Sequence, residues 1–116
     1  MTDALWDTGA TFSAITPDVA KQLKLVPISR VKVAAVHTAN IVNVCLVTVE
    51  LPNHVVSKDI RVAVCNLNSN VGMILGMDII MLGDFAISNS NKQSLFSFAI
   101  PPFKRKMDFA ARKNEP

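Results

Sequence analysis

Asp7-Thr8-Gly9 is the first stretch of the chain whose residue types could carry out chemistry. A carboxylate works as a general acid or base when its position is fixed. Taken alone, the tripeptide is more typical of an ordinary turn, in which Asp bonds its own backbone and Gly supplies a positive φ. However, the apolar Ala4-Leu5-Trp6 predicts a short strand, so Asp7 would stand at its rigid end. This context favours a catalytic carboxylate, with the simple turn as the alternative.

A second stretch, Met73 to Ile80, combines an apolar strand with a glycine and a short helix. Ile74 and Leu75 precede Gly76, and a glycine at this position lets a strand pass very close to another backbone. The sequence therefore predicts a close approach between Gly76 and another segment.

The rest of the chain predicts mostly short strands with one or two short helices. Thr16 is suited to an N-cap and Pro17 to the first helical position, so we expect a helix that ends near Lys24 and buries Val19, Ala20 and Leu23. A second helical turn is expected to stop at Gly83. Alternating and β-branched residues predict strands over residues 26–36, 41–51, 55–64 and 72–75, and a closing hairpin from 85–88 and 95–100. This pattern indicates an all-β fold, closed or sandwiched.

Composition excludes several classes of protein. Half of the 116 residues are hydrophobic and 18% are charged, which suits a small domain with some apolar surface for a subunit interface. The net charge of +3 lies in the last thirteen residues, since residues 1–103 have seven basic and seven acidic side chains. With few aromatic residues and a neutral body, a nucleic-acid-binding role for this basic tail is not expected. We also expect no membrane span and no signal peptide, and hence a cytoplasmic or intracellular setting.

The sulfur-containing residues predict no metal site or cofactor. Cys45 and Cys65 lie in apolar stretches without a CxxC or Cys/His cluster, so small buried hydrophobes are the expected role. A disulfide between them is left open by the sequence. The methionines are expected to fill gaps in the core or at interfaces.

In order and spacing, these motifs resemble the retropepsin-like aspartic proteases. Residues 4–16 resemble the active-site strand and loop of that family, and residues 74–78 its apolar-apolar-Gly motif and following helix. Residues 83–89 and 96–101 resemble the closing segment of bacterial and retroelement members. The resemblance implies a closed acid-protease barrel over residues 1–102, followed by the basic tail 103–116, and an aspartic endopeptidase activity without a cofactor.

The resemblance also implies a homodimer that acts on peptide or protein substrates. Two aspartates about 3 Å apart share one proton and activate a water between them, and Asp7 is the one aspartate here that is followed by Thr-Gly. A two-fold axis would bring Asp7 opposite its copy, with Thr8 bracing the loops across the axis and Gly9 offering its N–H to the carboxylate. The implied substrate-binding residues are Ala10, Val36, His37, Thr38, Ala39, Leu75 and Gly76.

Two departures from the family pattern motivate an alternative. The flap, a hairpin that covers the substrate, would lie near residues 36–41, where no glycine is present for a tight turn. Six residues precede Asp7, where the family has a longer segment, so an exposed strand edge is expected. The alternative is a retropepsin-fold domain that dimerises or binds peptide with weak or no hydrolysis.

Overall fold

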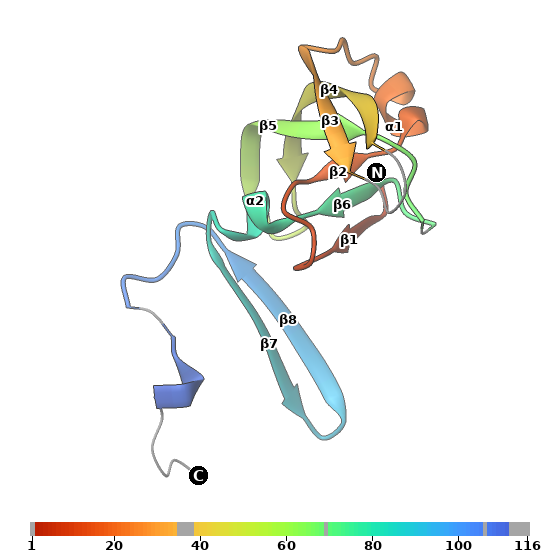
Figure 1. Cartoon of the computed structure of the whole chain (residues 1–116). Coiled ribbons are helices and arrows are strands. Elements are labelled where there is room, and N and C mark those ends of the chain that lie inside the picture. Colours follow the sequence, from red (N-terminus) through yellow and green to blue (C-terminus); the bar gives the residue numbers. More distant parts are fainter. Residues whose placement is uncertain (1, 35–38, 69, 106, 112–116) are drawn as a thin grey trace.

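The computed structural model describes residues 2–34, 39–68, 70–105 and 107–111 (Figure 1). It is mostly β, with two very short helices and one turn of 3-10 helix. The strands are β1 (Ala4–Trp6), β2 (Ala14–Ile15), β3 (Ser29–Ala34), β4 (Ala39–Glu50), β5 (Val56–Val64), β6 (Met73–Leu75), β7 (Asp84–Ser90) and β8 (Gln93–Ala99). The helical segments are α1 (Pro17–Gln22), α2 (Met77–Ile80) and η1 (Phe109–Ala111). The all-β prediction is thus confirmed, while the closed barrel stays a prediction.

Strands β1 to β6 form one six-stranded sheet in the order β1-β6-β2-β5-β4-β3, and β7 and β8 form a separate hairpin. Strand β6 runs parallel to β1 and antiparallel to β2, so it lies between the two segments that flank the Asp7 loop. On its outer side, β2 pairs with β5 in parallel. Strand β1 stands at one end of this order, with Leu5 exposed.

Several strand boundaries differ from the predictions. Ala39 and Asn40, expected to interrupt the strands, belong to β4 and pair with Ala34 and Val33. Strand β3 is shorter than the predicted range 26–36, and β7 and β8 are longer at the tip of their hairpin than predicted. The strand predicted over residues 55–64 is present from Val56, with a register shift against β4 between Val47 and Val49. At Ala39 and Asn40, pairing with a neighbouring strand outweighs the local preference that suggested a break.

The core joins side chains of β2, β4, β5 and β6 with one residue each from α1, α2 and β8. Its largest fully buried hydrophobic side chains are Ile15, Val62 and Ile79. Thr16 caps α1 as expected, accepting a hydrogen bond from the Val19 N–H at 3.3 Å. Val19 is buried, whereas Leu23, the C-cap of α1, is exposed although its N–H still bonds the Val19 carbonyl, so the expected burial of Leu23 is wrong.

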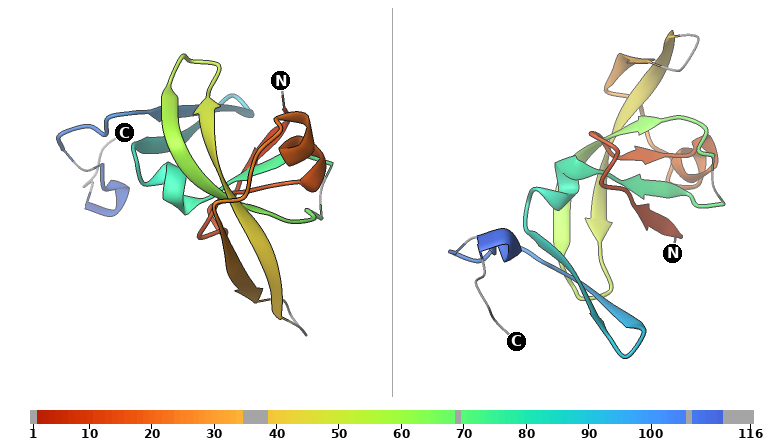
Figure 2. Two further views of the ribbon diagram at one scale, coloured as in Figure 1. Left: turned by 90° about the horizontal axis from the view of Figure 1, so that it is seen from above. Right: turned by 60° about the horizontal axis from the view of Figure 1, so that its bottom comes forward.

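The β7–β8 hairpin stands out from the six-stranded sheet in Figures 1 and 2. The radius of gyration is 16.6 Å, against about 13 Å for a compact chain of this length. Phe103 and Met107 are exposed, and a 3-10 turn covers Phe109–Ala111. Within the described ranges, no helix is long and apolar enough to cross a membrane.

Candidate active site

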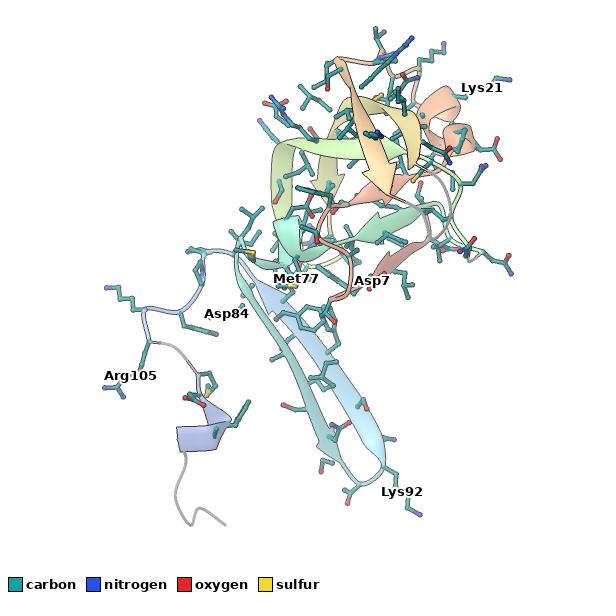
Figure 3. The ribbon with its side chains drawn as sticks, viewed as in Figure 1. Asp7, Lys21, Met77, Asp84, Lys92 and Arg105 are labelled. Atoms are coloured by element: carbon teal, nitrogen blue, oxygen red, sulfur yellow. The ribbon has the colours of Figure 1, made fainter. Side chains whose placement is uncertain are left out.

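Asp7 follows directly after β1 and is held from both sides of its peptide. Its backbone N–H donates to the Leu75 carbonyl at 2.9 Å, which extends the pairing of β1 with β6 by one residue. Its carbonyl accepts the Ala10 N–H at 3.2 Å and so closes a turn. The side chain is half-buried, and Figure 3 places it between the sheet and the root of the hairpin. A carboxylate is thereby fixed at the end of a strand but remains open to solvent.

The Gly9 N–H donates to Oδ1 of Asp7 at 2.9 Å, which is the contact that the family resemblance implies. Gly9 does not have a positive φ, so that part of the turn interpretation is wrong. The rest of the turn is present, because Asp7 bonds its own backbone through this contact and through the Ala10 N–H. A Cβ at Gly9 would lie 3.2 Å from the same Oδ1, which is a tight contact. The loop therefore combines turn geometry with a backbone donor against the carboxylate.

Gly76 makes the close backbone approach predicted from the sequence. A Cβ at this position would lie 2.8 Å from the Ala10 carbonyl oxygen and 2.9 Å from that of Phe12. The next two residues fasten the same loop, because the Met77 N–H donates to Ala10 O at 2.7 Å and the Asp78 N–H to Thr11 O at 3.2 Å. The first turn of α2 thus serves as a backbone clamp on the loop after Asp7.

Ser13 and Asp78 complete this clamp and were not among the predicted site residues. Ser13 is fully buried, and its hydroxyl donates to Asp78 Oδ1 at 2.6 Å while accepting the Gly76 N–H at 2.9 Å. The Ser13 N–H also donates to Asp78 Oδ2 at 3.0 Å. Because the carboxylate additionally accepts the Ile79 N–H at 2.9 Å, Asp78 joins the end of the loop to the start of α2.

The sequence around Ser13 and Asp78 contains only a weak local signal that these two residues pair. Asp78 lies in the first turn of a short helix, where an acid is ordinary. Ser13 lies between Phe12 and Ala14, with nothing to indicate burial. The pairing joins residues 65 positions apart, and spacing along the chain carries no information on such a contact.

The predicted site residues fall into three groups. Asp7, Thr8, Gly9 and Ala10 form one loop, in which Thr8 and Gly9 are exposed and Ala10 is half-buried. Leu75 and Gly76 lie beside it but are buried, and the Gly76 N–H is already used by Ser13, so any direct contact with a substrate stays a prediction. The predicted flap residues Val36, His37 and Thr38 lie outside the described residues, as does the side chain of Ala39.

The flap prediction can be followed as far as its strands. Strands β3 and β4 pair up to Ala34 and Ala39, on either side of residues 35–38. The two strands therefore form the arms of a hairpin at the predicted position, and its role as a flap stays a prediction.

The titratable and sulfur-containing groups show no second centre in the described part of the chain. No group of three or more His, Cys, Asp or Glu residues there could hold a metal ion. Cys45 and Cys65 are both free thiols, so the disulfide left open by the sequence is not formed. Burial raises the pKa of the Cys65 thiol, which disfavours a reactive thiolate.

A strand-end Asp-Thr-Gly carboxylate, a glycine clamp and a mostly β fold together define an aspartic-protease-like domain. The family model described as aspartyl protease matches residues 1–79, which include β1 to β6 and nearly all of α2. The chain therefore belongs to the aspartyl protease family, in the retropepsin-like clan. No curated protein and no solved structure matches the chain.

Proposed function

We propose that the chain is an aspartic endopeptidase that works as a homodimer and hydrolyses peptide bonds with a water held between two Asp7 carboxylates. The observation that carries this proposal is the fixed position of Asp7, whose Oδ1 accepts the Gly9 N–H on a loop clamped by Gly76 and Asp78. Family membership supports the same activity.

The chemistry requires the second copy. One carboxylate takes a proton from water while the other, protonated, polarises the scissile carbonyl. Two carboxylates at about 3 Å cannot both ionise, so they share a proton and titrate as a pair. Because Thr8 and Gly9 are exposed beside the half-buried Asp7, this side of the loop is available to a second loop across a two-fold axis.

Other parts of the proposal follow from the same dimer. Thr8 would hydrogen-bond across the axis, and Ala10 with the residues near 36–39 would border an extended peptide. Independently of the dimer, the proposed enzyme has a closed acid-protease barrel over residues 1–102, a separate tail over residues 103–116 and an intracellular setting.

The test compares the chain with its Asp7→Asn variant on a mixed peptide library between about pH 4 and 7. The variant should lose cleavage by about 10²- to 10⁴-fold, because an amide cannot take the proton from water. Its fold should survive, since the Asn Oδ1 can still accept the Gly9 N–H. Asp3→Asn is the control, because it removes an exposed carboxylate four residues before Asp7 and should leave cleavage unchanged.

Full activity in Asp7→Asn would overturn the proposal. Cleavage by neither protein, with a dimer present in solution, would favour the alternative of a dimerisation or peptide-binding domain without efficient hydrolysis.

A further inference from the structure

One face of the β3–β4 hairpin carries two cations beside apolar side chains. In an antiparallel pair, residues directly opposite each other point to the same side, as do residues two apart on one strand. Arg30 is opposite Asn43, and Asn43 is opposite Val64, so these three side chains form a row across β3, β4 and β5. Lys32 and Ile41 are opposite each other one step further along the hairpin, on the same side. These five residues make up the Arg30 face.

A pocket of about 500 Å³ opens on this face, between the hairpin and the start of α1. Its lining residues are Pro17, Arg30, Ile41, Val42, Asn43 and Val64. The volume is typical of ligand sites, which span about 300–1,000 Å³. However, most of the lining side chains are exposed, and Ile41 is 69% exposed. Such an open pocket suits a side chain of an extended peptide better than an enclosed small molecule.

The charges around the pocket have one sign. Residues 19–49 contain four Lys or Arg side chains and no Asp or Glu, although residues 1–103 as a whole are balanced. Within the described ranges, the side chains of Arg30 and Lys32 make no hydrogen bond or ion pair, not even with Asp18, the acid that follows Pro17. Unpaired cations beside apolar side chains are complementary to a ligand that has both carboxylates and apolar groups.

We propose that the Arg30 face binds an acidic, extended stretch of a protein substrate, with carboxylates on Arg30 and Lys32 and an apolar side chain beside Ile41. The guanidinium of Arg30 can donate two hydrogen bonds to one carboxylate. Arg30 and Lys32 lie two residues apart on β3, which is also the spacing of two acids on the same side of an extended peptide. The inference rests on the proposed function, because that activity supplies the peptide. The face contains no residue of the Asp7 loop, so this contact is separate from the scissile bond.

The first test measures the dissociation constant of a rhodamine-labelled peptide, Val-Thr-Glu-Thr-Glu-Thr-Val, by fluorescence anisotropy. The protein is the full chain with Asp7→Asn, so that binding is read without cleavage. The same peptide with Gln in place of both Glu residues measures the contribution of charge. At low salt the Glu peptide should bind about three- to tenfold more tightly, as expected for two exposed ion pairs. In about 1 M salt this preference should disappear through screening.

The second test compares variants on the two faces of the sheet. Arg30→Glu should abolish the preference for the Glu peptide, because it replaces an attractive charge with a repulsive one. Arg61→Glu is the matched control, since Arg61 is exposed opposite Leu46 and, three residues from Val64 on β5, points to the other side. It changes the net charge equally and should alter the preference by less than about twofold. Ile41→Ser should weaken both peptides by about two- to fivefold and leave the preference unchanged, since it reduces apolar contact alone.

Equal binding of the Glu and Gln peptides, or equal effects of Arg30→Glu and Arg61→Glu, would overturn the acidic-peptide site. A single-stranded oligonucleotide that binds more tightly than the Glu peptide, and loses affinity in Arg30→Glu, would assign the face to nucleic acid and overturn the proposal as well. The proposed function fails separately. An Arg30-dependent preference for the Glu peptide in a chain that cleaves no peptide would retain this site and remove the protease, whereas cleavage without such a preference would do the reverse.

Discussion

The loop after Asp7 and the β7–β8 hairpin attach to neighbouring residues of the same strand, yet different forces hold them. The loop is held by directed hydrogen bonds, several of which converge on the Asp78 carboxylate from Ser13 and Ile79. The hairpin root is held mainly by stacked rings around Trp6, with the Asn53 side chain donating to the Phe98 carbonyl at 2.8 Å.

This difference separates a rigid part from an adaptable part. Hydrogen bonds to a charged acceptor constrain distance and direction, which suits the proposed role of Asp7 as a carboxylate that must be placed to within a fraction of an ångström. Apolar contact is non-directional, so the hairpin can shift slightly relative to the sheet without losing its attachment to Trp6. Substitutions in the loop and in the hairpin should therefore differ in their effects on stability and cleavage, and the largest expected effect is at Asp78.

Asp78→Ala should break the loop clamp. It leaves two donors of the buried Ser13 without an acceptor, so we expect unfolding to become easier by about 3 kcal/mol. Asp84→Ala is the matched change in the hairpin, where one exposed backbone donor is lost, and should cost less than about 1 kcal/mol. Urea unfolding of both variants measures the difference, and equal costs would contradict the comparison.

Gly76→Ala should displace the loop, because its Cβ would meet the Ala10 and Phe12 carbonyl oxygens at under 3.0 Å. We expect a loss of about 2 kcal/mol and roughly 100-fold slower peptide cleavage from the displaced Asp7. Gly83→Ala would instead meet the Ala99 carbonyl oxygen at the hairpin root. In Gly83→Ala, amide hydrogen exchange should become faster in the hairpin, while residues 8–13 stay protected. Faster exchange in residues 8–13 with an unchanged hairpin would contradict the separate roles of Gly76 and Gly83.

Trp6→Ala should loosen the hairpin, since it removes the ring that contacts Phe85, Phe96 and Phe98. For a half-buried tryptophan we expect a loss of about 2 kcal/mol. Trp6→Phe, which keeps a ring, should recover part of it. Exchange of the amides in β7 and β8 is the measurement, and unchanged protection there would show that other contacts hold the hairpin.

Thr16→Ala should have a smaller effect than Asp78→Ala, Gly76→Ala or Trp6→Ala, because it touches neither the clamp on the Asp7 loop nor the root of the hairpin. It removes the N-cap of α1 and should cost about 1 kcal/mol, with Thr16→Ser restoring most of it. Thermal unfolding measures the loss, and peptide cleavage at 25 °C should stay at the wild-type rate. A large drop in cleavage would mean that α1 supports the Asp7 loop more directly than its contacts indicate.

Sequence reasoning was most successful where the signal is local. The cap at Thr16, the strand before Asp7, the close approach at Gly76 and the closing hairpin were all predicted from neighbouring residues. It was wrong for the exposure of Leu23, the ends of β4 and the expected positive φ of Gly9. The errors for Leu23 and β4 concern where a partner segment lies, which residue type and spacing do not specify, whereas the φ of Gly9 is decided locally by the turn from Asp7 to Ala10.

The sequence by itself determined the family and the candidate catalytic residue, because Asp-Thr-Gly after an apolar strand and apolar-apolar-Gly before a short helix are short patterns fixed by local backbone chemistry. Only the tertiary structure identified Ser13 and Asp78 as the clamp and placed the Phe85–Phe98 and Ile87–Phe96 pairs on one face with Trp6 at its root. These contacts join segments far apart in the chain, and their energies depend on burial and direction. Both properties exist only after the strands have paired.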